Sequence, residues 1–170
     1  MRMSLSLVGL MLIIFSWSGC SKSDGVIAIG TDAMVKFKAG GKSYTHLVVY
    51  CTYRDSTLTI TSNAVIPDGN SPNLALQVTG VLDVGLYHLD DDGLAPEVDF
   101  LALTTPFDAA GGGYITDAGY AIVLNITRID TRNKAIEGTF SGNLVYKLHG
   151  EAFPDDTMKV EDGSFLVYYF

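Results

Sequence analysis

The segment Thr57-Leu58-Thr59-Ile60-Thr61 decides the fold, because its polar and apolar residues alternate without a break. Successive side chains of a β-strand point to opposite faces, so the alternation predicts a half-buried strand with Leu58 and Ile60 facing inward. Residues 34–38 and 74–78 alternate in the same way. Three such segments in the first half of the chain indicate that it is built from strands.

Turn-forming residues separate the expected strands. Gly40-Gly41 lies between two β-rich segments and predicts a hairpin, and residues 67–72 are rich in Pro, Gly and Asn. No stretch combines helical periodicity with capping residues. We count roughly nine or ten short strands, at the spacing typical of sandwiches and barrels. We therefore predict an all-β fold, either an antiparallel β-sandwich or a partly open barrel.

The last part of the chain is predicted to consist of short strands and one loop. Residues 135–140 and 143–148 are two expected strands. Residues 150–156 contain Pro154 and are expected to form a loop. Residues 158–170 are then expected to form a closing hairpin that turns at Gly163.

The N-terminus has the order of a secretory signal. Met1-Arg2-Met3 is basic, residues 5–17 are almost entirely apolar, and the small residues Ser18-Gly19 precede Cys20. This order resembles a bacterial lipoprotein signal, in which cleavage leaves the cysteine as the new N-terminus and its thiol is lipidated, with palmitate as one acyl chain. An uncleaved anchor and a secretory signal without lipid are the alternatives.

The signal defines the expected domain organisation. Residues 1–19 are the signal peptide, residues 20–25 a lipidated tether, and residues 26–170 a single β-sandwich domain. Each buried lipid methylene contributes about 0.8 kcal/mol, so several acyl chains on Cys20 would hold the protein to a membrane. Without Cys20, Cys51 has no disulfide partner, and its apolar surroundings predict a buried, unreactive thiol.

The charge of the chain limits its partners. The net charge is −8, and it becomes −9 when Arg2 leaves with the signal. This acidity argues against nucleic acid, which requires a basic face, and against attraction to anionic lipid. The lipid on Cys20 is thus the expected link to the membrane. No motif predicts a cofactor, since Gly111-Gly112-Gly113 lacks the Lys and the Ser or Thr of a phosphate-binding loop.

Two kinds of side-chain site are weak candidates. Asp90, Asp92 and Glu97 belong to the densest acidic cluster and could offer oxygen ligands to Ca²⁺, although their spacing does not match an EF-hand and a solvated turn also explains them. Ser56 and Thr157 each follow an Asp, in a pattern that resembles O-glycosylation sites of exported Bacteroidota proteins.

The search for catalytic and binding residues gives little else. The three histidines are far apart and lack metal-ligand spacing, and no nucleophile elbow occurs. The only tryptophan, Trp17, leaves with the signal, so a sugar-binding platform would have to use tyrosine or phenylalanine. The tyrosines considered for it are Tyr44, Tyr50, Tyr53, Tyr87, Tyr114 and Tyr120.

The C-terminal third carries a pattern of short motifs. Ile-Thr-Arg-Ile-Asp (126–130), Lys-Ala-Ile-Glu-Gly-Thr-Phe-Ser (134–141) and Lys-Val-Glu-Asp-Gly-Ser-Phe (159–165) follow one another. This pattern resembles small lipoproteins of Bacteroidota, including the uncharacterised DUF6252-like group, in which such strands close a β-sandwich. The resemblance implies a cell-envelope lipoprotein of unknown function, and it brings no catalytic residues.

The same motifs have a physical interpretation. Gly138 lets the chain bend or a neighbouring strand approach closely, while Phe140 and Phe165 supply core area on adjacent strands.

Together these observations predict a lipid-anchored protein of the cell envelope, placed at the outer membrane. The expected role is a non-catalytic binding or structural module, so the chain is not expected to be an enzyme, and its partner is an envelope protein or a glycan. A glycan-binding accessory lipoprotein and an envelope hydrolase are the alternatives. An open concave face lined with tyrosine would favour a glycan, whereas a deep cleft with two carboxylates would favour a hydrolase.

Overall fold

The computed structural model describes residues 32–63, 71–80, 83–88, 98–104, 112–117 and 119–169. These residues form eleven strands and no helix, so the prediction of an all-β fold is confirmed. In the described ranges, no helix is long and apolar enough to cross a membrane. The strands are β1 (Met34–Ala39), β2 (Lys42–His46), β3 (Val48–Arg54), β4 (Thr57–Asn63), β5 (Asn73–Thr79), β6 (Gly85–His88), β7 (Val98–Thr104), β8 (Gly113–Ile115), β9 (Ile122–Asp130), β10 (Ala135–Leu148) and β11 (Glu151–Tyr168).

All the strands belong to one antiparallel sheet that is nearly closed into a barrel. The order of pairing is β2-β1-β11-β10-β8-β7-β5-β4-β3, and β9 adds to β10 and carries β6 on its other side. Only Leu47 separates β2 from β3 in the chain. The two ends of the pairing order are therefore joined by a single residue.

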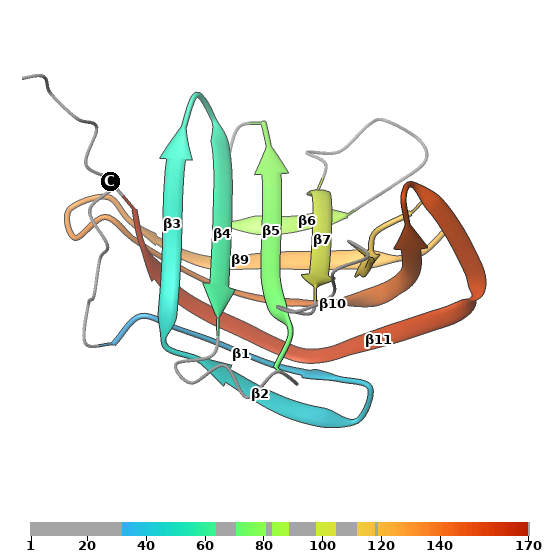
Figure 1. The fold of residues 1–170 in the computed structure, drawn as a ribbon. Helices are drawn as coiled ribbons and strands as arrows, with labels where there is room; N and C mark the ends of the chain where they lie inside the picture. The colour runs from blue at the N-terminus through green and yellow to red at the C-terminus, as the bar shows by residue number, and fades with distance from the viewer. Residues whose placement is uncertain are drawn as a thin grey trace, which may run out of the picture.

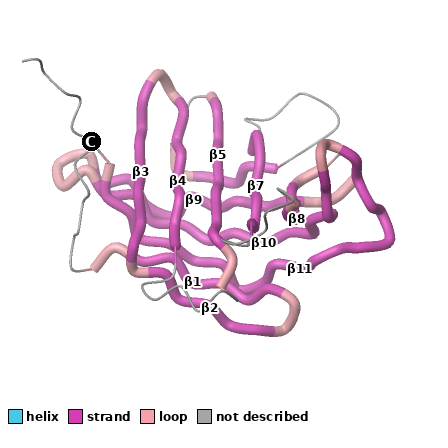
Figure 2. Tube along the Cα trace, in the orientation of Figure 1, coloured by secondary structure: helices cyan, strands magenta, loops and turns pink. Residues whose placement is uncertain are grey.

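The sheet folds over into two layers (Figure 1). Strands β3, β4, β5 and β7 lie in front, and β6, β9, β10, β11 and β1 run across them behind. Strand β10 belongs to both layers, because its first part pairs with β9 and its last part pairs with β8. Figure 2 shows β8 at the end of the front layer, next to β7.

Strands β10 and β11 are long and continuous, with 14 and 18 residues, whereas short strands and a loop were expected. The prediction of a loop over residues 150–156 is wrong, as is the closing hairpin over residues 158–170. The ladder keeps its continuity through bulges: Val145 pairs with Thr157 and the next residue of β10 pairs with Phe153. The residues skipped on β11 include Pro154, which a bulge tolerates because it needs no backbone donor.

The core lies between the two layers and contains the inward residues of both. Leu58 and Ile60 are buried, as predicted, and so are Phe140 and Phe165. The rings of these two phenylalanines have centroids 6.4 Å apart. A Cβ at Gly138 would lie 2.5 Å from Phe165 Cζ, so a side chain at this position would displace the ring. The predicted close approach at Gly138 is therefore confirmed.

His46 links the layers through a buried hydrogen bond. It ends β2 behind, and its Nδ1 lies 2.9 Å from the Oγ of Ser62 on β4 in front. Its ring packs edge-on against Phe37, with centroids 5.2 Å apart. The Nε2 atom is buried and has no hydrogen-bond partner among the described residues. Burial lowers the pKa of His46, and the bond to Ser62 opposes this shift.

Replacing Phe140 tests the core. Phe140→Ala should reduce the free energy of unfolding by about 3–5 kcal/mol, because it leaves a cavity between the layers. A urea titration followed by circular dichroism measures the loss. Thr139→Ala, an exposed change on the same strand, is the control and should stay within about 0.5 kcal/mol of the parent. An unchanged free energy of unfolding in Phe140→Ala would show that the ring is not part of the core.

Acid should destabilise the fold through His46. Because burial disfavours its charged form, the unfolded chain takes up the proton first. The stability is therefore complete above the ordinary pKa of 6.5 and falls as the pH drops below it. The slope from one such group is at most about 1.4 kcal/mol per pH unit.

Urea titrations between pH 5 and pH 8 measure this slope. His46→Leu should remove the part of the slope that comes from His46. His149→Asn, a change in an exposed turn, should leave that part unchanged. An equal slope in the parent and in His46→Leu would contradict the assignment.

Candidate functional site

One part of the sheet extends beyond the core. Strand β1 stops pairing with β11 at Val160, and from residue 158 to residue 151 the partner of β11 among the described strands is β10. We call residues 146–158 the arm. Figure 1 shows the two strands of the arm turning upward at the right, away from the start of β1. Residues 151–157 are all exposed.

Three aromatic side chains form a row across the base of the arm. Tyr146 on β10 pairs with Tyr114 on β8 and with Phe153 on β11. Directly paired residues of an antiparallel ladder share a face, so the three rings lie side by side. The ring centroids are 5.4 Å apart for Tyr114 and Tyr146, and 5.9 Å apart for Tyr146 and Phe153. We call these three residues the aromatic row.

The aromatic row continues the inner face of the front layer. Leu103 on β7 pairs with Tyr114 and is buried in the core. Beyond Leu103 the burial decreases: Tyr114 and Tyr146 are half-buried, and Phe153 is 43% exposed. The row therefore begins at the core and ends in solvent, and its outer end has apolar surface to offer to a ligand.

Two tyrosine hydroxyls tie the bulge of the arm to its neighbours. The Tyr114 hydroxyl donates to Asp156 Oδ1 over 2.8 Å, and the Tyr120 hydroxyl donates to the Pro154 carbonyl over 3.4 Å. Burial raises the pKa of Tyr114, and the bond to Asp156 raises it further, so the hydroxyl stays protonated. These bonds fix the position of residues 154–156 beside the row.

A hollow of about 280 Å³ lies on the opposite face of the same strands. Ala102, Thr104 and Ile115 form part of its lining, with Lys147 and His149. The Lys147 ammonium lies 3.3 Å from Asp117 Oδ1. A second hollow, of about 400 Å³, lies over Ser141, Asn143, Lys159 and Glu161. Both hollows are open to solvent.

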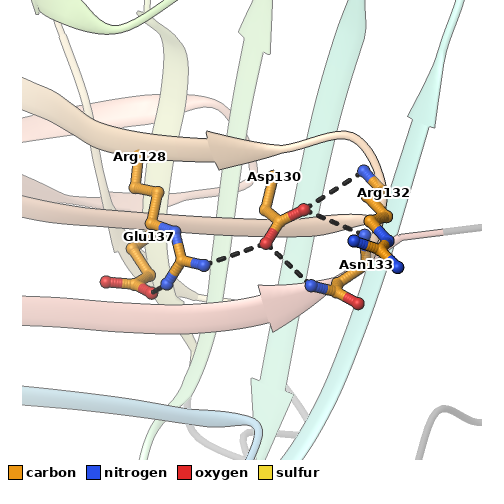
Figure 3. Close-up of polar contacts among 5 residues, drawn as sticks. All are labelled: Arg128, Asp130, Arg132, Asn133 and Glu137. Carbon is orange, nitrogen blue, oxygen red and sulfur yellow. Dashed lines mark hydrogen bonds and ion pairs between the residues drawn. The ribbon is translucent and has the colours of Figure 1, made fainter.

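A compact charge cluster occupies the β9–β10 turn (Figure 3). Asp130 accepts hydrogen bonds from the backbone amides of Arg132 and Asn133, from the Asn133 side chain and from Arg128. The Asn133 bonds, followed by Arg128, lower the pKa of Asp130. Arg128 also donates to Glu137 over 2.8 Å. The hydrogen bonds that Asp130 accepts stabilise the turn, and this structural role accounts for the cluster without a ligand.

The predicted modification sites fall in very different surroundings. Ser56 lies in the exposed two-residue turn between β3 and β4, where Asp55 and Ser56 both have the positive φ of a tight hairpin. Thr157 is exposed on β11, within the arm. Their glycosylation stays a prediction. Cys20 lies outside the described residues, and so do the predicted calcium ligands, Asp90, Asp92 and Glu97.

Cys51 fits the prediction of an unreactive thiol. It is buried, and burial raises its pKa to about 12, so the thiolate that reacts with electrophiles is not formed at neutral pH.

Nothing in the described part of the chain indicates catalysis. No group of three or more His, Cys, Asp or Glu residues there could hold a metal ion. Comparisons with protein-family models, with curated proteins and with solved structures found no match to the chain. The aromatic row is therefore the candidate site on its geometry alone.

Sequence reasoning found only part of this site. Tyr114 and Tyr120 were among the tyrosines considered for a sugar platform, whereas Tyr146 and Phe153 were not. The missing information is the register, which places these two residues opposite each other across the bulge. The sequence signal for this register is the dipeptide His149-Gly150. In the structure both residues have the positive φ of a tight hairpin turn.

Phe153 should matter little to stability. Phe153→Ala should cost about 1 kcal/mol or less in the free energy of unfolding, because the ring is 43% exposed and leaves no closed cavity. The measurement is the urea titration used for Phe140→Ala, which serves as the buried reference. A loss as large as that of Phe140→Ala would show that the outer end of the row belongs to the core.

Proposed function

We propose that this chain is a non-catalytic binding module of the bacterial cell envelope, held at the outer membrane by lipid on Cys20. The observation that carries the proposal is the aromatic row. The fold places three aromatic rings in a row that runs from the edge of the core onto the arm, and the outermost ring adds exposed apolar surface. A single exposed apolar side chain is common on soluble domains, so the proposal rests on the three rings lying next to one another.

The position of the arm agrees with display from a membrane. Strand β1 begins at Met34, which pairs with Leu166 of β11, and the tip of the arm is at Gly150. Sixteen residues of β11 and its turn separate these positions, or roughly 50 Å of strand at 3.3 Å per residue. A tether that leads to β1 therefore reaches the domain at one end of β11, and the arm lies toward the other end.

Several of the acidic residues form ion pairs within the fold. The carboxylates of Asp130 and Glu137 both contact Arg128, and Asp162 contacts Lys38 over 2.6 Å. A glycosidase needs one protonated and one ionised carboxyl group facing a shared substrate. The pKa values of Asp130 and Asp162 are lowered, mainly by hydrogen bonds from Asn133 and from Lys38 respectively, so neither carboxyl group is the protonated acid of such a pair.

Labelling with palmitate tests the anchor. Full-length protein, expressed in a Gram-negative host with labelled palmitate, should carry the label and collect in the outer-membrane fraction. Cys20→Ala should lose the label and leave that fraction. Cys51→Ala is the matched control and should keep both, because its thiol is buried in the domain. An unlabelled parent protein, or label that survives Cys20→Ala, would contradict the proposal.

A further inference from the structure

We propose that the aromatic row binds a neutral polysaccharide as a single, flexible chain, with Phe153 and Tyr146 as the stacking surface and Asp156 as a hydroxyl acceptor. The proposal rests on the proposed function and adds the class of ligand. Sugar rings have apolar C–H faces and a rim of hydroxyl groups. A ligand site for them combines exposed aromatic faces with fixed polar acceptors, and the row has both within one short stretch of the sheet.

The inclination of the rings argues against a ligand with a flat face. The planes of Tyr114 and Tyr146 are inclined by 61°, and those of Tyr146 and Phe153 by 50°. Because the three rings do not lie in one plane, they do not form the flat platform that the face of a crystalline polymer requires. The row spans three strands, about 10 Å from end to end at the usual spacing of strands. A short segment of a twisted, soluble chain fits such a surface.

The polar groups beside the row select a neutral ligand. Asp156 already accepts a hydrogen bond from Tyr114, and a carboxylate has further acceptor positions for ligand hydroxyls. Glu151 and Asp155 add two more negative charges to the arm. The arm's lysine, Lys147, pairs with Asp117 on the opposite face. An anionic polymer would therefore be repelled at the row.

The size of the row favours a glycan over a protein partner. A phenylalanine side chain has about 150–250 Å² of surface to bury, and Phe153 exposes 43% of its own. A stable protein interface buries about 800 Å² on each partner. The exposed apolar surface of the row is much smaller than such an interface, and it matches the area that one or two sugar rings cover.

Affinity electrophoresis tests the proposal. The purified lipoprotein in mild detergent is run in native gels that contain soluble starch, galactomannan or xyloglucan, and in a gel that contains the anionic polymer polygalacturonate. At least one neutral polymer should retard the protein, and polygalacturonate should not. Phe153→Ala and Tyr146→Ala should each weaken the retardation roughly tenfold or more, the change expected for about 1.4 kcal/mol of stacking.

The chain offers a matched control for the loss of an exposed aromatic ring. Tyr50 on β3 is 42% exposed, nearly the same as Phe153, and lies outside the row. Tyr50→Ala should leave the retardation unchanged, and Tyr146→Phe should retain most of it. Microcrystalline cellulose, which presents a flat face, should not remove the protein from solution.

Several results would overturn the proposal. Absence of retardation by all three neutral polymers would do so, and so would retardation by polygalacturonate alone. Equal weakening by Tyr50→Ala and Phe153→Ala would show that the row is not the site. Palmitate on Cys20 is measured separately, so loss of the ligand class would leave the anchored binding module standing, and loss of the anchor would leave this test unaffected.

Discussion

The pairing of β10 with β11 is the constraint on which the rest of the structure depends. It is the longest ladder of the sheet, and β10 takes part in both layers because its neighbour changes from β9 to β8. A regular ladder of this length would lie in one layer. The bulges at Phe140/Gly142 and Val145/Tyr146 let it bend, as strands do at the corners of crossed sheets. The core and the arm are therefore two parts of one hairpin.

The neighbouring ladder, between β9 and β10, begins at the β9–β10 turn. Asp130 bonds to two backbone amides of the turn, and Ala135 pairs with Asp130 as the ladder begins. A slip by one residue would turn Ile136 and Phe140 out of the core, because strand side chains alternate between faces. The polar cluster in the turn thus supports the apolar packing along the rest of the strand.

The sequence is a good guide where burial alternates along a strand, and a poor one where pairing alone makes the strand. Residues 57–61 and 74–78 have one face in the core, and their pattern predicted them. Residues 151–157 include Pro154 and two Asp residues, and all of them are exposed, so no apolar face reveals a strand. Their conformation follows from their partner, β10, and this is also why the row of Tyr146 and Phe153 could not be recognised from its residues.

The exposed edge of the arm has a consequence for self-association. An unpaired strand edge is a template on which a second copy of a chain can extend the sheet. Within the described part of the chain β11 has no second neighbour here, and this edge contains Pro154, which has no amide hydrogen to donate, followed by the exposed carboxylate of Asp155. A second arm approaching edge to edge would meet a missing donor and charges of its own sign. The residues that interrupt the ladder therefore also disfavour edge-to-edge strand pairing between two molecules.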